Sequence, residues 1–243
     1  MNNLLVDLYG NFYPGLLEEA KTLKPSAAFP LLIKVSDQYV NADIKVMIVG
    51  QETDEWYGRL NEDEHSIETL MDGYHNYLFK ISQNGKARTS RPFWNMKNFE
   101  YFESKFKVEG KSVSFIWNNI SKIGNHGSGR PAPDIRRLEK SHFNVIKSEV
   151  EIVKPDIILF TTGSRDGYIK EHFGKNSKFI PKLYYSDGSL IEKSVNMIAE
   201  VKLEHFPEIC SVRVEHPNRR SIDNGIVLHI LNQCWKSMNT QKS

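Results

Sequence analysis

The chain has 243 residues, 40% of them hydrophobic, and a formal net charge of +2 at pH 7. This size and composition suit a globular protein with a large core, and no Pro-, Gly- or Ser-rich linker divides the sequence. We therefore expect a single domain over residues 1–243. The small positive charge permits nucleic acid as a partner without requiring it.

Cysteine usage and hydropathy argue against several classes of protein. Cys210 and Cys234 are the only cysteines and have no CxxC spacing. A cysteine-ligated metal site or a disulfide framework is therefore not expected. No apolar run reaches the roughly 20 residues that a membrane span needs, and the first residues lack the basic and apolar regions of a signal peptide. We expect a cytoplasmic protein with no metal, no cofactor and no membrane partner.

Hydrophobic spacing predicts the elements of the first half of the chain. In order they are a helix over residues 4–24 that contains Pro14, a residue suited to a helical first turn, a connection over 29–40, a strand over 44–49, a helix over 67–81, a helix opened by Pro92, and a strand over 113–117. Residues 1–40 thus form an N-terminal helical extension. The helix after Pro92 carries an aromatic stripe that we assign to core packing.

The second half alternates helices and strands in the same way. In order we predict a long helix over residues 135–153, a strand over 156–160, a helix over 168–173, a strand pair over 184–200, a strand over 211–214, a final helix and a flexible tail over 237–243. The strand pair has its turn at 186–189. The final helix has Ser221 as its N-cap, and its inward-facing residues include Ile222, Ile226, Ile230 and Cys234. The glycine-containing loop over 124–131 lacks the residue order of a P-loop.

Strands separated by helices favour a mainly parallel sheet with helices on both faces. The carboxyl ends of such strands meet along one edge, where open α/β sheets bind their ligands. Four strand ends here carry polar groups: Gln51, Glu52 and Asp54; Asn118 and Asn119; Thr161, Thr162 and Ser164; and His216 and Asn218 with two arginines. The order of these groups along the chain is the strongest functional signal in the sequence.

Three of these strand ends resemble the motifs of the uracil-DNA glycosylase superfamily. The motifs are Gly50-Gln51-Glu52, Trp117-Asn118-Asn119 and His216-Pro217-Asn218-Arg219, the last just before a C-terminal helix. The resemblance covers roughly residues 44–235 in layout. It implies an α/β fold, a three-layer sandwich with a central, mainly parallel four-stranded sheet. It also implies a metal-independent hydrolase that cleaves the N-glycosidic bond of uracil or a related altered base during DNA repair.

Carried over by position, the resemblance predicts three groups of site residues. The catalytic residues are Glu52, Asp54 and His216. The substrate-binding residues are Gly50, Gln51, Trp56, Tyr57, Asn118 and Asn119. The DNA-binding residues are Ser164, Asn218, Arg219, Arg220 and Ser221. The implied partner is DNA, as a single strand or with its target base flipped out, and we expect the protein to be a monomer.

The residue types suit this chemistry. Cleavage of an N-glycosidic bond builds positive charge on the sugar and negative charge on the departing base. A carboxylate near the sugar stabilises the first and orients water, and an imidazole stabilises the second. An asparagine carboxamide offers both a donor and an acceptor to the edge of a base. Arginines bind the phosphates of the distorted strand while the base leaves the stack.

The loop after the first strand departs from the family pattern. The family commonly has Asp-Pro-Tyr after Gly-Gln, whereas residues 52–57 read Glu-Thr-Asp-Glu-Trp-Tyr. Either Glu52 or Asp54, or neither, supplies the carboxylate. One alternative is a non-catalytic protein that binds a nucleobase or nucleic acid on the same fold. Another is an unrelated α/β domain in which these are ordinary loop residues, although no GxSxG elbow supports an esterase.

Overall fold

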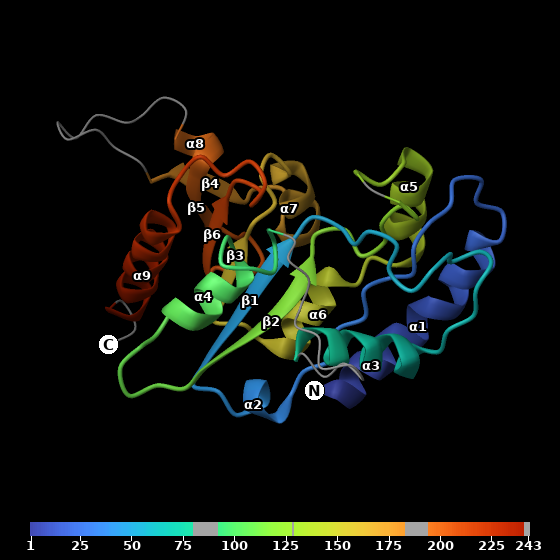
Figure 1. Cartoon of the computed structure of the whole chain (residues 1–243), viewed down its shortest axis with the longest axis horizontal. Helices are drawn as coiled ribbons and strands as arrows, with labels where there is room; N and C mark the ends of the chain where they lie inside the picture. Colours follow the sequence, from blue (N-terminus) through green and yellow to red (C-terminus); the bar gives the residue numbers. More distant parts are fainter. Residues whose placement is uncertain (80–91, 128, 183–193, 241–243) are drawn as a thin grey trace. The chain divides into compact units, whose positions relative to one another are not determined.

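A computed structural model describes residues 1–79, 92–127, 129–182 and 194–240 (Figure 1). The chain divides into two compact units, each assembled from three separate stretches. The first unit comprises Met1–Val40, Gln51–Ala87 and Asn118–Lys154. The second comprises Asn41–Gly50, Arg88–Trp117 and Pro155–Ser243.

A six-stranded sheet forms the centre of the second unit. Its strands are β1 (Ile44–Gly50), β2 (Val113–Asn119), β3 (Ile157–Phe160), β4 (Lys178–Pro181), β5 (Ile198–Lys202) and β6 (Cys210–Val214). Their order is β2-β1-β3-β6-β5-β4. β1, β3 and β6 are parallel, with Val49 beside Phe160 and Phe160 beside Arg213. The arrows of β1 and β2 also point the same way in Figure 1. The expected α/β class and mainly parallel sheet are confirmed.

The expected number of four strands is wrong, because β5 and β4 extend the sheet beyond β6. Both are antiparallel additions, with β5 lying between β6 and β4. β4 alternates exposed and half-buried positions over only four residues, so its apolar pattern is too short to identify a strand. The sequence predicts a strand pair over 184–200; β5 overlaps the end of that range, and the predicted turn at 186–189 lies outside the described residues.

Helices of the second unit cover both faces of its sheet. They are α4 (Phe99–Lys105), α7 (Asp166–Phe173), α8 (Ser194–Met197) and α9 (Asn224–Thr240). Arg213 of β6 pairs with Asp166 of α7 at 2.9 Å. Cys210, three residues earlier, lies near Cys234 of α9, which packs on β6, and burial together with this second thiol raises the pKa of Cys210. Because successive strand residues alternate between faces, α7 and α9 lie on opposite sides of β6.

Two helices of this unit are shorter or later than the sequence predicted. Residues 92–98 form turns, and α4 begins only at Phe99. α9 begins at Asn224, so Ser221 is not its N-cap, and it continues to Thr240 through most of the predicted tail. Ile226 is exposed, and the buried position belongs to Val227.

The first unit is helical and centred on α1 (Asn2–Ala20), which contacts α3 (Ile67–Leu78), α5 (Pro133–His142) and α6 (Ile146–Val153). A short helix, α2 (Asp37–Val40), falls within the predicted connection. The buried stripe of α1 follows the 3.6-residue period through Leu5, Tyr9, Tyr13, Leu16 and Ala20. Pro14 lies well inside α1 and not in its first turn. It is tolerated at an exposed position of the helix.

The predicted long helix over residues 135–153 is instead two helices. α5 ends at His142, and the backbone of the next residue, Phe143, leaves the helical region with φ −144° and ψ 42°. The buried Phe143 ring stacks on Tyr9 of α1 at a centroid distance of 6.2 Å. Tertiary packing of this ring therefore accompanies the break that helical periodicity alone does not predict.

Within the described part of the chain, no helix is both long and apolar enough to cross a bilayer.

Candidate functional site

In the first unit, the loops that follow β1 and β2 lie side by side. The backbone N–H of Ser121, after β2, donates to the carbonyl of Gln51, after β1, at 2.9 Å. An extended segment joins both loops, since Phe29 N–H donates to Trp56 O at 3.0 Å and Leu31 N–H donates to Lys122 O at 2.9 Å. The structure therefore brings the Gly-Gln-acid loop next to the chain that follows the asparagines.

A glycine permits this close approach. A Cβ atom added to Gly124 would lie 1.9 Å from the backbone carbonyl oxygen of Thr53. Any other residue would push the two loops apart, so the glycine-containing loop has a packing role within the first unit. Glu52 and Asp54, on either side of the buried Thr53, are half-buried.

Four aromatic side chains hold the loop over residues 51–58 against α3. The Trp56 ring lies 5.2 Å from Tyr57 and 5.8 Å from Tyr77, at steep angles of 62° and 89°. His65 lies edge-on to Tyr57 at 5.3 Å, and its Nε2 donates to the Tyr57 carbonyl at 3.0 Å. The Tyr57 hydroxyl occupies space next to Gly73, where a Cβ would be only 1.6 Å away.

The backbone of this loop is strained. Glu55 and Tyr57 have φ values of +48° and +58°, in a region that non-glycine residues rarely adopt. Such conformations cost about 1–3 kcal/mol each, persist only where surrounding contacts enforce them, and are concentrated at ligand sites. Here the contacts of Tyr57 with His65 and Gly73 enforce the conformation.

Asn118 belongs to a buried ionic cluster. The Lys122 ammonium donates to both Glu149 carboxylate oxygens, at 2.8 and 3.0 Å, and to Asn118 Oδ1 at 2.8 Å. Tyr9 donates to Glu149 Oε1 at 2.6 Å. Burial lowers the pKa of Lys122 and, with the Glu149 charge, raises that of Tyr9 well above its ordinary value. Lys122 and Glu149 are fully buried, so the cluster fixes the end of β2 from inside the first unit.

The Asn118 carboxamide is largely committed to this cluster. Its Nδ2 donates to Glu149 Oε2 at 2.9 Å, and its Oδ1 accepts from the Asn119 N–H at 2.8 Å as well as from Lys122. Asn119, the other predicted base reader, is also buried. Charged partners therefore fix the position of Asn118.

A second buried group lies beside the first. Arg136 Nη1 donates to Glu139 at 2.6 Å and to Ser121 at 2.8 Å, and the Lys122 N–H donates to Glu139 at 2.8 Å. Burial raises the pKa of Glu139. Sequence reasoning missed both groups. The available signal was the placement of charges at core spacing: Glu149 three residues after Ile146, and Lys122 between Ile120 and Ile123.

In the second unit, the ends of β1, β3 and β6 are connected at one edge of the sheet. Thr161, after β3, donates from Oγ1 to Val49 O at 3.1 Å, and Gly163 N–H donates to Val214 O at 3.1 Å. The strand order reverses here, because β2 lies on one side of β1 and β3 on the other. Gly50 ends β1 at this switch point, where α/β sheets bind ligands. Ser164 is exposed on the following loop.

The His216 loop forms a tight turn after β6. Arg219 N–H donates to His216 O at 2.8 Å, and Asn218 N–H donates to His216 Nδ1 at 3.3 Å. Acceptance at Nδ1 leaves Nε2 as the donor of the neutral ring. Ser221 donates from both N and Oγ to Glu215 Oε2, at 2.7 Å each. Asn218 and Arg219 are exposed.

Arg220 differs from its neighbour because its guanidinium points into the second unit. It donates to Lys97 O at 3.1 Å, to Asn98 Oδ1 at 2.9 Å and to Asn224 Oδ1 at 2.5 Å. Burial lowers the pKa of Arg220 to about 10. These contacts fasten the His216 loop to the turn before α4.

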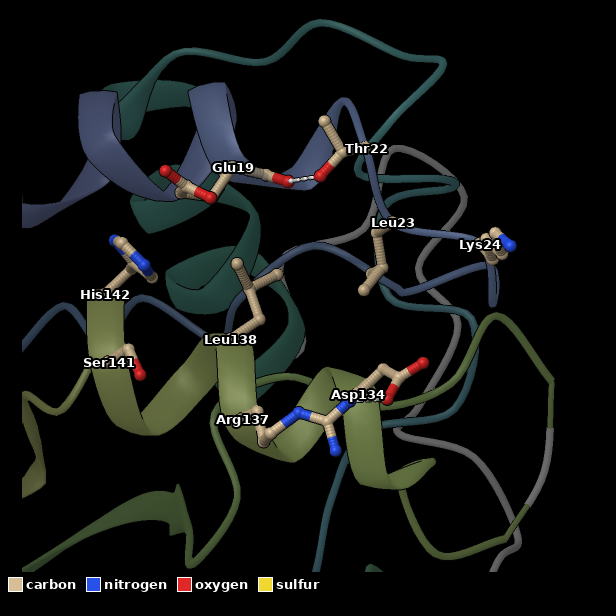
Figure 2. Close-up of a pocket in the computed structure, with 9 residues that line it drawn as sticks. All are labelled: Glu19, Thr22, Leu23, Lys24, Asp134, Arg137, Leu138, Ser141 and His142. Carbon is tan, nitrogen blue, oxygen red and sulfur yellow. Dashed lines mark hydrogen bonds and ion pairs between the residues drawn. The ribbon is translucent and has the colours of Figure 1, made fainter.

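One pocket of the first unit contains none of the predicted site residues. Its volume is about 460 Å³, and Figure 2 shows its walls, the end of α1 with the following turn and one face of α5. Glu19 and Asp134 balance Lys24 and Arg137 in formal charge. The pocket lining therefore selects neither an anion nor a cation.

The predicted site residues fall into two groups by unit. The first unit holds the loop after β1 and both asparagines, and the second holds Gly50, Ser164 and the His216 loop. Among the described residues, no cluster of three or more His, Cys, Asp or Glu side chains is arranged to hold a metal ion. Comparison with protein-family models and with the sequences of curated proteins finds no match.

Proposed function

We propose that the chain is a monofunctional, metal-independent DNA glycosylase related to the uracil-DNA glycosylase superfamily. It would act as a cytoplasmic monomer in DNA repair and hydrolyse the N-glycosidic bond of an altered base. The observation that carries the proposal is the strand order β2-β1-β3-β6. In this order the three strands that carry the family-like motifs belong to one parallel core, with β4 and β5 as additions to the expected four strands.

Each predicted residue has a defined part in the proposed reaction. Glu52 or Asp54 stabilises positive charge on the sugar and accepts a proton from the attacking water. His216 donates from Nε2 to the departing base. The rings of Trp56 and Tyr57 contact the base, and Asn119 reads its edge while the buried cluster holds Asn118. Gly50 and Gln51 shape the loop beside them.

The test is base release from oligonucleotides containing uracil, hypoxanthine or other altered bases, scored as abasic sites. The three variants are Glu52→Gln, Asp54→Asn and His216→Ala, each made singly. We expect His216→Ala and one of the two carboxylate variants each to reduce the rate by roughly 10²–10⁴-fold, the usual contribution of a positioned acid or base. Glu55→Gln, at an exposed residue of the same loop, is the matched control and is expected to keep full activity.

If all three variants release the base as fast as the unaltered protein, these residues do not perform the catalysis. Tight binding of the same oligonucleotides without any release by the unaltered protein would instead support the alternative of a non-catalytic nucleic-acid-binding protein.

Arg219 and Arg220 are expected to have different roles, since Arg219 would contact DNA and Arg220 stabilises the fold. Arg219→Gln should leave stability unchanged and reduce the slope of log affinity against log salt by roughly 0.7–0.9, the loss of one phosphate contact. Arg220→Gln should lower the free energy of unfolding by about 1–3 kcal/mol, because buried acceptors lose their donor. For both variants, salt titrations of DNA binding measure the slope, and urea unfolding measures the free energy of unfolding. An unchanged slope for Arg219→Gln would remove that residue from the DNA surface.

A further inference from the structure

The chain that leaves β2 is held by two buried carboxylates, both from the first unit. Glu149 of α6 accepts hydrogen bonds from the Lys122 ammonium and from the Asn118 carboxamide. Glu139 of α5 accepts from the backbone N–H of Lys122. Both carboxylates are at most 1% exposed. The path of residues 118–122 is therefore set by charged groups as well as by apolar packing.

A buried ion pair is an inefficient way to stabilise a fold. The cost of taking two charges out of water offsets most of their attraction, and well-packed apolar residues of similar volume are often as stable or more stable. The best-attested role of buried polar groups is to fix one geometry among several. Lys122 and Glu149 are both fully buried and lie 2.8 Å apart, so their pairing is better explained by a geometry that they impose.

The geometry that this pair imposes is the orientation of the Asn118 carboxamide. Its Oδ1 accepts from the Lys122 ammonium at 2.8 Å, and its Nδ2 donates to Glu149 at 2.9 Å. A half-turn of the amide would place its NH₂ group against the ammonium and its oxygen against the carboxylate. Two attractive contacts would become repulsive in a buried environment, so only one orientation is allowed.

The Glu149 carboxylate is itself held by a second element. The Tyr9 hydroxyl of α1 donates to Glu149 Oε1 at 2.6 Å and accepts from the backbone N–H of Ile33 at 3.0 Å. Rotation of the carboxylate away from Lys122 would break the contact with α1 as well. The cluster is thus a rigid support for the carboxamide.

The fixed carboxamide in turn holds the next residue of the chain. Asn118 Oδ1 accepts the backbone N–H of Asn119 at 2.8 Å. In the reversed orientation the NH₂ group would face this N–H, and the hydrogen bond would be lost. Asn119 is the last residue of β2 and the reader of the base edge in the proposed reaction. The buried pair therefore reaches the proposed reader through one carboxamide.

We propose that Lys122 and Glu149 are positioning residues: resting on the glycosylase function proposed above, they hold the Asn118 carboxamide in one orientation, which fixes the backbone of Asn119 for reading the target base. Because both residues are fully buried, they act through Asn118 and not by contact with the base. Neither forms or breaks a bond in the reaction.

The variant that tests the inference combines Lys122→Met with Glu149→Leu, which removes both charges at similar volume. Release of the base from a uracil- or hypoxanthine-containing oligonucleotide is expected to fall roughly 10²-fold in kcat, because a misplacement of about 1 Å is sufficient for such a loss. KM should change much less, since the proposed phosphate contacts of the His216 loop are untouched.

Leu16→Ala is the control for a loss of stability alone. Leu16 is buried in α1 and belongs to its apolar stripe. Its truncation destabilises the core without changing the charges around Asn118. The folded fraction of each protein is measured by circular dichroism, and kcat per folded molecule is expected to stay unchanged in this control. If the double variant also keeps its kcat per folded molecule, the positioning role is overturned.

Amide hydrogen exchange, followed by NMR, tests the positioning step without requiring catalysis. In the double variant the Asn119 N–H is expected to exchange roughly 2–10-fold faster relative to the amides of β1, the loss expected for one hydrogen bond. The amides of β1 report any general loss of stability in the same sample. Unchanged relative exchange at Asn119 would overturn the proposed route through Asn118.

The two measurements separate this inference from the proposed function. Faster exchange at Asn119 together with slower base release supports both. Faster exchange with unchanged base release overturns the positioning role and keeps the glycosylase. Faster exchange in the variant, with no base released even by the unaltered protein, removes the glycosylase and leaves the cluster as a support of Asn119 without a part in catalysis.

Discussion

Replacing Glu149 by glutamine is expected to lower the free energy of unfolding by about 3–5 kcal/mol. The substitution preserves size and leaves the Lys122 ammonium buried with no counter-charge. Lys122 is fully buried and has three acceptors, the two carboxylate oxygens of Glu149 and Asn118 Oδ1. An uncompensated charge in such a place costs several kcal/mol, and urea unfolding of the variant measures the loss.

Glu151→Gln is the matched control because it makes the same change on the same helix. Its 3.8 Å pair with Lys147 is half exposed, so a change within about 0.5 kcal/mol is expected. The double replacement Lys122→Met with Glu149→Leu should recover part of the loss, since no charge stays buried. Recovery is incomplete because the Tyr9 hydroxyl and Asn118 Nδ2 lose their acceptor. A loss below about 1 kcal/mol for Glu149→Gln would show that water reaches this cluster.

Replacing Gly73 by alanine is expected to destabilise the protein by about 1–3 kcal/mol through overpacking. A glycine inside a helix normally gains about 1 kcal/mol when it becomes alanine. At Gly73 the new methyl group would lie 1.6 Å from the Tyr57 hydroxyl and 2.2 Å from Cζ. The Tyr57 ring must therefore move, and with it the loop over residues 51–58.

Gly10→Ala in α1 provides the comparison, because no atom beyond its chain neighbours and the local helix backbone lies within 4 Å of the added Cβ. It is expected to raise stability by up to about 1 kcal/mol. Combining Gly73→Ala with Tyr57→Ala should remove most of the penalty. Thermal unfolding of the unaltered protein, the two single variants and the double variant gives the coupling energy between the two residues. If Gly73→Ala stabilises the protein as Gly10→Ala does, Tyr57 is not held as described.

The sequence predicted the elements at the sheet edge well because their signals are local. Residues 44–49, 113–117, 156–160 and 211–214 are short runs rich in apolar residues that end in glycine or polar residues, and each overlaps a strand. Such runs need no knowledge of their neighbours. The alternation of strands and helices then limits the connections that are possible.

Features that depend on distant partners were not predictable in the same way. The break at Phe143 accompanies stacking on Tyr9, more than 100 residues earlier. The burial of Glu149 depends on Lys122 and Tyr9, and charged residues read from sequence alone are expected at the surface. The inward guanidinium of Arg220 depends on the turn before α4. The roles of Glu52, Asp54 and His216 stay predictions.

The order of the strands has a consequence for how the chain acquires its structure. β1 pairs with β3, and the Lys45 N–H donates to Asp156 across 111 residues of sequence. Pairings between such distant segments are slow to form, because a long loop must close before any contact compensates for the lost entropy. A ribosome therefore has to deliver β3 before β1 acquires its neighbour on that side, and then β6 before β3 is paired on both sides, so apolar strand residues stay uncovered while the chain is being made.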